Sequence, residues 1–222
     1  MADPPGISAR ADGGRQVLLI ACGALAREIV ALVRGSRWDA LSVSCLPARL
    51  HNSPHLIAGA VRERIREARG RFGRIYVAYG DCGTGGALDE VLAEEGIERI
   101  PGPHCYEFYA GPAGFAELAG SDPGTFFLTD FLVRHFERLI VGGLGLDRHP
   151  ELLSDYFGNY RRLVYLAQTD DAALTAAAAA AARRLGLGFE RRFTGYGGLA
   201  RFVERAASAG ATDAGAVRRP AA

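Results

Sequence analysis

Four cysteines recur at a repeated spacing, and they are the residues of this chain best suited to chemistry. Cys45 follows Cys22 by 23 positions, and Cys105 follows Cys82 by the same 23 positions. Cys22 and Cys82 each end a strand-like apolar run, and each is followed by a glycine and a helix-like run. Two such strand–helix–strand units bring four thiols to one edge of a parallel sheet. Thiolates gathered there can bind a soft metal ion or act as nucleophiles.

The segment 79–86 reads Tyr-Gly-Asp-Cys-Gly-Thr-Gly-Gly and joins a strand-like run to a helix-like run. Glycines let the backbone approach a ligand closely, and a helix N-terminus offers free N–H groups and a positive dipole end. We therefore expect a cofactor or anion to bind at Gly80, Gly83, Thr84, Gly85 and Gly86. The same setting should lower the pKa of Cys82 and make it a catalytic thiolate. The segment matches neither the phosphate-loop nor the dinucleotide pattern.

Two histidines accompany the cysteines. His104 directly precedes Cys105, and His51 follows Cys45 on the same predicted loop. Thiolates combined with imidazole suit zinc, and thiolates also hold iron in clusters. The competing interpretation is a set of buried cysteines with incidental surface histidines. The candidate metal ligands are Cys22, Cys45, Cys82, Cys105, His51 and His104.

Two polar residues of the second half are candidate catalytic groups. Asp130 stands at an expected helix start, and His149 lies on a charged loop just before Pro150. Residues 124–147 are apolar, aromatic and glycine-containing, which favours a lid or wall over a site. We expect Asp130 and His149 to lie nearest the thiols, where either could orient a histidine or accept a proton. The alternative is that both only cap helices.

Composition excludes several classes of function. The net charge of +1 argues against nucleic acid or a membrane surface as a partner. The chain has no lysine, which excludes a Schiff base. No apolar run reaches the roughly 18 residues of a membrane span, and no apolar signal core is present at the start. We expect a cytoplasmic protein with reduced thiols.

The alternation of strand-like and helix-like runs predicts an α/β fold. We expect a mainly parallel sheet with helices on both faces, built from Rossmann-like βα repeats. Residues 15–206 would form a single α/β domain, or two lobes at 15–110 and 111–206. Residues 1–14 and 207–222 are expected to be disordered tails. The expected strands are 16–21, 41–46, 74–79, 97–100, 163–167 and 189–193.

Several segments together resemble the DUF1638 family, over roughly residues 16–205. They are residues 21–25 (Ala-Cys-Gly-Ala-Leu), 50–52 (Leu-His-Asn), 79–86, 104–108 (His-Cys-Tyr-Glu-Phe), 127–131 (Phe-Leu-Thr-Asp-Phe), 147–151 (Asp-Arg-His-Pro-Glu) and 156–160 (Tyr-Phe-Gly-Asn-Tyr). The resemblance implies a soluble bacterial or archaeal protein, often found alongside corrinoid-dependent methyltransferase systems. It assigns neither an activity nor site residues.

Three hypotheses follow, and whether the protein is an enzyme stays open. The first is a Cys/His metal-binding protein of the methyl-transfer or one-carbon class, holding zinc or an iron–sulfur cluster. The second is a metal-free thiol enzyme that uses Cys82. The third is a non-catalytic module that binds a phosphate-bearing or corrinoid ligand. The expected partners are a small-molecule substrate and a corrinoid protein or methyltransferase.

Overall fold

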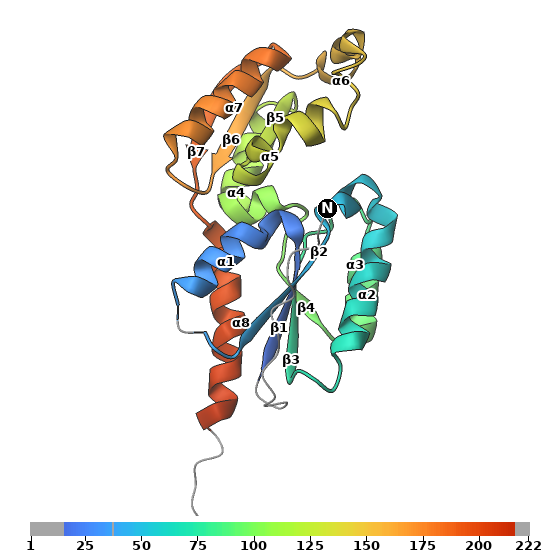
Figure 1. Ribbon diagram of the computed structural model, residues 1–222, viewed down its shortest axis with the longest axis vertical. Helices are drawn as coiled ribbons and strands as arrows, with labels where there is room; N and C mark the ends of the chain where they lie inside the picture. Colours follow the sequence, from blue (N-terminus) through green and yellow to red (C-terminus); the bar gives the residue numbers. More distant parts are fainter. Residues whose placement is uncertain (1–15, 37, 216–222) are drawn as a thin grey trace, which may run out of the picture. The chain divides into compact units, whose positions relative to one another are not determined.

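The computed structural model describes residues 16–36 and 38–215 of the chain. Their contacts divide them into two compact units, each of which is considered by itself (Figure 1). The first unit holds the residues up to Phe108 and those from Gly198 onward, and the second holds the stretch from Tyr109 to Gly197. The end of the described chain therefore returns to the unit in which it began.

All four strands of the first unit are parallel, in the order β2–β1–β3–β4. β1 is buried along its whole length, as expected for a parallel strand covered on both faces. The chain passes from β1 to β2 on one side and from β3 to β4 on the other, so the direction of winding reverses between β1 and β3. The strands are β1 (Val17–Cys22), β2 (Leu41–Leu46), β3 (Arg74–Ala78) and β4 (Glu98–Arg99).

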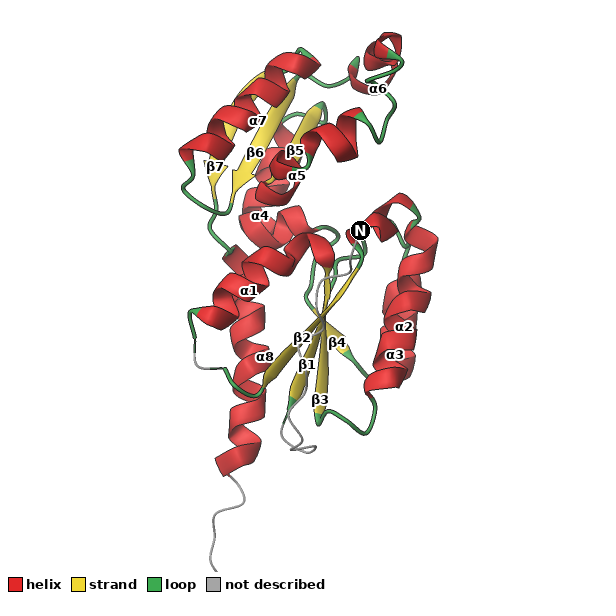
Figure 2. Cartoon of the chain, viewed as in Figure 1, coloured by secondary structure: helices red, strands yellow, loops and turns green. Residues whose placement is uncertain are grey.

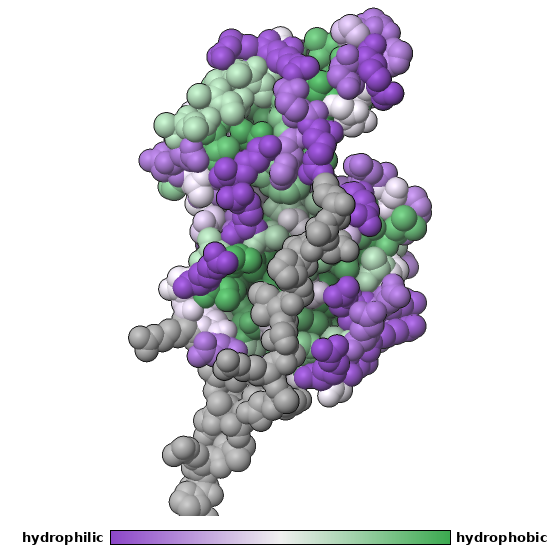
Figure 3. Space-filling model, viewed as in Figure 1, coloured by the Kyte–Doolittle hydropathy of each residue, from purple (hydrophilic) through white to green (hydrophobic). Residues whose placement is uncertain are grey.

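Helices cover both faces of this sheet, with α2 and α3 along one face and α1 and α8 along the other (Figure 1). α2 buries Val61 and Ile65 and exposes Glu63 and Glu67, so its outer side is hydrophilic in Figure 3. Three short 3-10 helices follow β1 and β2. The helices are α1 (Ala26–Arg34), α2 (Ile57–Ala68), α3 (Ala87–Glu95), α8 (Gly197–Gly215), η1 (Gly23–Leu25), η2 (Ala48–Asn52) and η3 (Pro54–Leu56).

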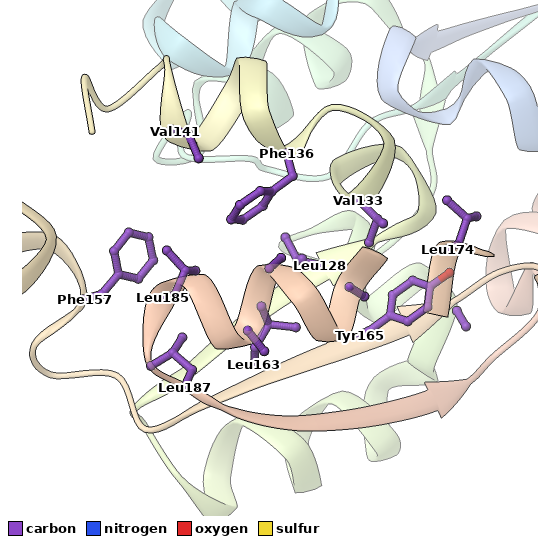
Figure 4. Close-up of a cluster of buried hydrophobic side chains, with 14 of the residues drawn as sticks. Leu128, Val133, Phe136, Val141, Phe157, Leu163, Tyr165, Leu174, Leu185 and Leu187 are labelled. Atoms are coloured by element: carbon purple, nitrogen blue, oxygen red, sulfur yellow. The ribbon is translucent and has the colours of Figure 1, made fainter. Parts of the chain in front are cut away.

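The second unit is built on a parallel sheet in the order β5–β6–β7. Its core joins Leu128, Leu163 and Tyr165 of the sheet to Leu185 of the alanine-rich helix α7 and to Phe136 (Figure 4). The elements are β5 (Thr125–Thr129), β6 (Arg162–Ala167), β7 (Gly188–Phe193), α5 (Asp130–Arg134), α6 (Leu153–Phe157), α7 (Ala172–Leu185), the π-helix η4 (Glu137–Val141) and the 3-10 helix η5 (Pro150–Leu152).

One helix belongs to both units. α4 (Cys105–Ser121) begins at the last cysteine and continues into the second unit. It is broken at Gly111, whose φ of 75° lies in the left-handed region and which precedes Pro112. Glycine adopts this conformation without steric cost, and proline cannot donate the next helical hydrogen bond.

The parallel α/β architecture expected from the sequence is confirmed, with its strands divided between two sheets (Figure 2). The strand β5 was not expected, because its apolar run continues directly into α5. Residues 207–215 were expected to be a disordered tail, whereas they continue helix α8. The expected tail 1–14 and residues 216–222 lie outside the described ranges. Over those ranges, no helix is both long and apolar enough to span a membrane.

A buried carboxylate joins the carboxyl ends of β5 and β6. Asp130, which is 1% exposed, accepts hydrogen bonds from the Tyr165 hydroxyl (2.7 Å) and from the Gln168 amide (3.0 Å). It also accepts from the Thr169 amide (3.1 Å) and the Thr169 hydroxyl (2.6 Å). Its own amide donates to Gln168 Oε1 at 2.7 Å. Both carboxylate oxygens of Asp130 therefore accept hydrogen bonds that link the end of β5 to β6 and the residues after it.

The Asp130→Asn variant should lower the free energy of unfolding by about 3 kcal/mol, because an amide cannot accept hydrogen bonds at both of its positions. Urea denaturation followed by far-UV circular dichroism measures the effect. The control is Asp155→Asn on the exposed side of α6, which should change stability by less than about 0.5 kcal/mol. Equal urea midpoints for the two variants would contradict the structural role of Asp130.

Candidate functional site

Four cysteines lie at the carboxyl edge of the first sheet, and we call this set the thiol rim: Cys22, Cys45, Cys82 and Cys105. Cys22 ends β1, and Cys45 is the second-last residue of β2. Cys82 lies in the loop after β3, and Cys105 begins α4 just after β4. Cys22 and Cys82 flank the point between β1 and β3 where the winding reverses, which is where open α/β sheets bind ligands. The sequence expectation of four thiols at one edge therefore agrees with the topology.

Close backbone contacts hold the loops of the rim together. The Cys82 amide donates to the Pro103 carbonyl at 2.9 Å. Gly80 lies so near that a Cβ on it would stand 2.8 Å from the same oxygen. Gly23 approaches Leu46 just as closely, with a Cβ position 2.9 Å from the Leu46 carbonyl oxygen. Only glycine fits at these two positions, so the loops after β3 and β4, and those after β1 and β2, are fixed in pairs.

The thiols lie near enough to one another to oppose each other's ionisation, and none forms a disulfide. Burial, with smaller contributions from Cys82 and Cys45, raises the pKa of Cys22 to about 12, although the Ala24 amide and Tyr79 offset part of this effect. Burial raises the pKa of Cys45 to about 11. The pKa of Cys105 is also raised, by burial and then by Cys82 and Cys22. At neutral pH these thiols are therefore protonated.

Cys82 differs from the sequence expectation. Burial raises the pKa of its thiol and the Asp81 carboxylate raises it further, while a backbone hydrogen bond at Gly80 and the charge of Arg99 offset part of this effect. The expected lowering by a helix N-terminus fails because α3 begins only at Ala87, beyond the glycine segment. Cys82 also has a φ of 51°, in the left-handed region that non-glycine residues rarely adopt.

The glycine loop binds a carboxylate of its own chain. Asp81 accepts from the amides of Gly83 (3.2 Å), Gly85 (3.3 Å) and Gly86 (2.9 Å), and from the Thr84 hydroxyl (2.6 Å). These bonds hold the pKa of Asp81 below its usual range, with the Thr84 bond the largest cause. Of the five predicted cofactor-binding residues, four thus bind Asp81, and Gly80 instead packs against Pro103. The anion-binding capacity of the loop is used internally to shape the turn that carries Cys82.

His51 lies beside the most buried cysteine. Its Nδ1 is 3.1 Å from the Ala48 carbonyl oxygen and 3.8 Å from Cys22 Sγ. A carbonyl can only accept, so Nδ1 carries the proton and Nε2 keeps a lone pair suited to a metal. Although the residue is exposed as a whole, withdrawal of this side of the ring from water lowers the pKa of His51, and nearby His104 lowers it further. His51 is therefore a neutral imidazole, and His104 lies within electrostatic reach of it.

Tyr79 is a component of the rim that the sequence did not reveal. It follows β3 directly, is 1% exposed, and lies with its ring stacked near that of His51, at 6.1 Å between centroids. Burial and the sulfurs of Cys22, Cys82 and Cys45 raise the pKa of its hydroxyl. The hydroxyl approaches Cys22 but finds no partner in hydrogen-bond geometry among the described residues. A tyrosine at the end of a buried strand, just before the glycine loop, was the available signal.

The four thiols and the neighbouring imidazole of His51 are donor groups that suit zinc or iron, but they lie too far apart to coordinate one ion. Thiols with an imidazole are the ligands of structural zinc sites and of iron–sulfur clusters. Within residues 16–36 and 38–215, however, no three His, Cys, Asp or Glu side chains are grouped closely enough to hold a metal ion. Binding of a metal therefore requires the loops to draw closer together.

Two other observations concern regions away from the rim. A surface hollow of about 610 Å³ lies at the opposite, amino end of β3, where Arg74, Tyr76 and Glu98 line it. In the second unit, His149 is exposed on the loop before η5 and its Nδ1 lies 3.2 Å from the Glu151 carboxylate. The expectation that Asp130 and His149 approach the thiols, and that residues 124–147 cover them, concerns the relation between the two units and stays a prediction.

The raised thiol pKa values predict a loss of stability at alkaline pH. A thiol whose folded pKa exceeds its ordinary value of 9.0 favours the folded state fully below pH 9, and this contribution is lost as the pH rises towards 12 for Cys22 and 11 for Cys45. The free energy of unfolding should therefore fall between pH 9 and 11. Urea titrations under reducing conditions measure this fall, and Cys22→Ala should flatten it. An unchanged slope in that variant would contradict the burial of a neutral thiol.

One of the comparisons with known proteins found a match. A sequence model of DUF1638, a family described as proteins of unknown function, matches residues 45–203. No curated protein and no solved structure matched the chain. The matched range includes Cys45, Cys82 and Cys105 of the thiol rim and the whole second unit. Since the match covers most of its length, this chain belongs to the DUF1638 family.

Proposed function

We propose that the thiol rim is a metal-binding centre that holds zinc or an iron–sulfur cluster. The observation that carries this proposal is the electrostatic coupling of four free cysteines at one sheet edge, with a neutral histidine 3.8 Å from one of them. Cys22, Cys45, Cys82 and Cys105 are the proposed ligands, with His51 or His104 available where a thiol does not reach.

The charges of the rim favour a metal over a free nucleophile. Burial raises the pKa of all four thiols, and other cysteines of the rim add to this for Cys22 and Cys105, so the four thiols offer little thiolate at neutral pH. A bound cation reverses this balance, because it stabilises several thiolates at once. The alternatives of an activated Cys82 and of a phosphate-binding glycine loop find less support, since the pKa of Cys82 is raised and Asp81 occupies the loop amides.

The finer function that we propose is methyl transfer or another one-carbon reaction. A zinc ion with an open position activates a thiol or water, and a cluster with an open iron acts as a Lewis acid or an electron donor. A soft metal held by thiolates suits substrates that carry sulfur or a methyl group. We further propose a cytoplasmic location, a small-molecule substrate, and a corrinoid protein or methyltransferase as partner. The one-carbon chemistry and the partner rest on the family resemblance, and the cytoplasmic location rests on the expectation of reduced thiols.

Protein purified without oxygen should contain about one zinc per chain, or iron with acid-labile sulfide and a brown colour. Elemental analysis and a sulfide assay separate the two outcomes. Protein with less than about a tenth of a metal ion per chain, which also fails to bind added Zn²⁺, Cd²⁺ or a reconstituted cluster, would contradict the proposal.

Single replacements should identify the ligands. Cys82→Ser should weaken Cd²⁺ binding by more than about 100-fold, because loss of a ligand costs more than loss of a group that only supports one. His51→Ala should weaken it by at least about 10-fold. The matched control is His55→Ala, since His55 is exposed on the neighbouring 3-10 helix η3. Equal Cd²⁺ affinity for the His51 and His55 variants would remove His51 from the site.

A further inference from the structure

The hydroxyl of Tyr79 is an unusual feature of the first unit. The side chain is 1% exposed, and its oxygen finds no hydrogen-bond partner among the described residues. Buried hydroxyls are normally hydrogen-bonded, because leaving one unpaired carries a desolvation cost. Phenylalanine would fill the same space without that cost. The presence of this hydroxyl therefore suggests a hydrogen-bond acceptor that forms when the protein binds a ligand.

The register of the sheet places Tyr79 beside Cys22, and each side chain shifts the pKa of the other. Ala21 of β1 pairs with Ala78 of β3, so the next residues along these parallel strands are Cys22 and Tyr79. Side chains of neighbouring residues on adjacent strands project to the same face of a sheet. His51 lies next to both residues, since its Nδ1 is 3.8 Å from Cys22 Sγ and its ring is stacked near that of Tyr79.

We propose that Tyr79 is a positioning residue that donates a hydrogen bond to the Cys22 sulfur once that sulfur is a metal-bound thiolate. This inference rests on the proposed metal-binding function. A neutral thiol is a weak acceptor, and the approach of the Tyr79 hydroxyl to it falls short of hydrogen-bond geometry, whereas a thiolate is a strong, charged acceptor. Metal binding at Cys22 would therefore convert this weak approach into a full hydrogen bond.

A purely structural tyrosine predicts the opposite pattern. If the hydroxyl served folding, its removal would destabilise the metal-free protein. If it serves the thiolate, its removal should stabilise the metal-free protein and weaken metal binding. The two effects have opposite signs, so they separate the explanations without an activity assay.

The test compares Tyr79→Phe with the unmodified protein, both in metal-free form. The thermal midpoint of the variant should rise by about 2–4 °C, because an unpaired buried hydroxyl is removed. Its affinity for Cd²⁺, followed by thiolate-to-metal absorption, should fall by about 10-fold, as for other groups that support a ligand. The control is Tyr76→Phe on the same strand, which should leave Cd²⁺ affinity unchanged.

A double variant shows whether Cys22 is the acceptor. In a Cys22→Ala background, Tyr79→Phe should no longer change Cd²⁺ affinity, because the acceptor is absent. A single Tyr79→Phe variant with unchanged affinity overturns the inference, as does an equal loss of affinity with and without Cys22. If the unmodified protein binds no Cd²⁺, the metal-binding function itself fails, and that result is distinct from the other two.

Discussion

Burial of four thiols at a single sheet edge is the constraint on which the proposed site depends. Each thiol is withdrawn from water, and ionisation of one opposes ionisation of its neighbours. The thiols of the rim are therefore protonated near neutral pH. A soft cation is the partner that changes this state, because it allows several thiolates to exist side by side.

The fold provides this edge through its winding. The order β2–β1–β3–β4 places the loops of Cys22 and Cys82 on either side of the reversal point, which is where open α/β sheets bind ligands. Asp81 then fixes the turn after β3 by filling the amides of the glycine loop, and Gly80 allows that turn to touch Pro103. The polar interactions of this loop thus serve to position Cys82 instead of binding an outside anion.

Sequence patterns predicted the parts of the structure that depend on local order. The repeated cysteine spacing and the apolar runs placed four thiols at strand ends, because parallel connections make that edge common to all strands. The patterns failed where distant residues decide the outcome. The pKa of Cys82 depends on burial and on Asp81, and the importance of Tyr79 depends on its register with Cys22. Likewise, the apolar run of β5 merges with α5, and the return of α8 to the first unit leaves no periodic signal.

The number of protons released when one metal ion binds tests the central claim most directly. Since the thiols are protonated near neutral pH, each one that becomes a ligand must lose its proton. Calorimetric titration of the metal-free protein with Zn²⁺ at pH 7, in buffers of different ionisation enthalpy, yields this number. A shared site at the thiol rim predicts about three or four protons per Zn²⁺. Release of one proton or none, or the absence of saturable binding, would contradict the account.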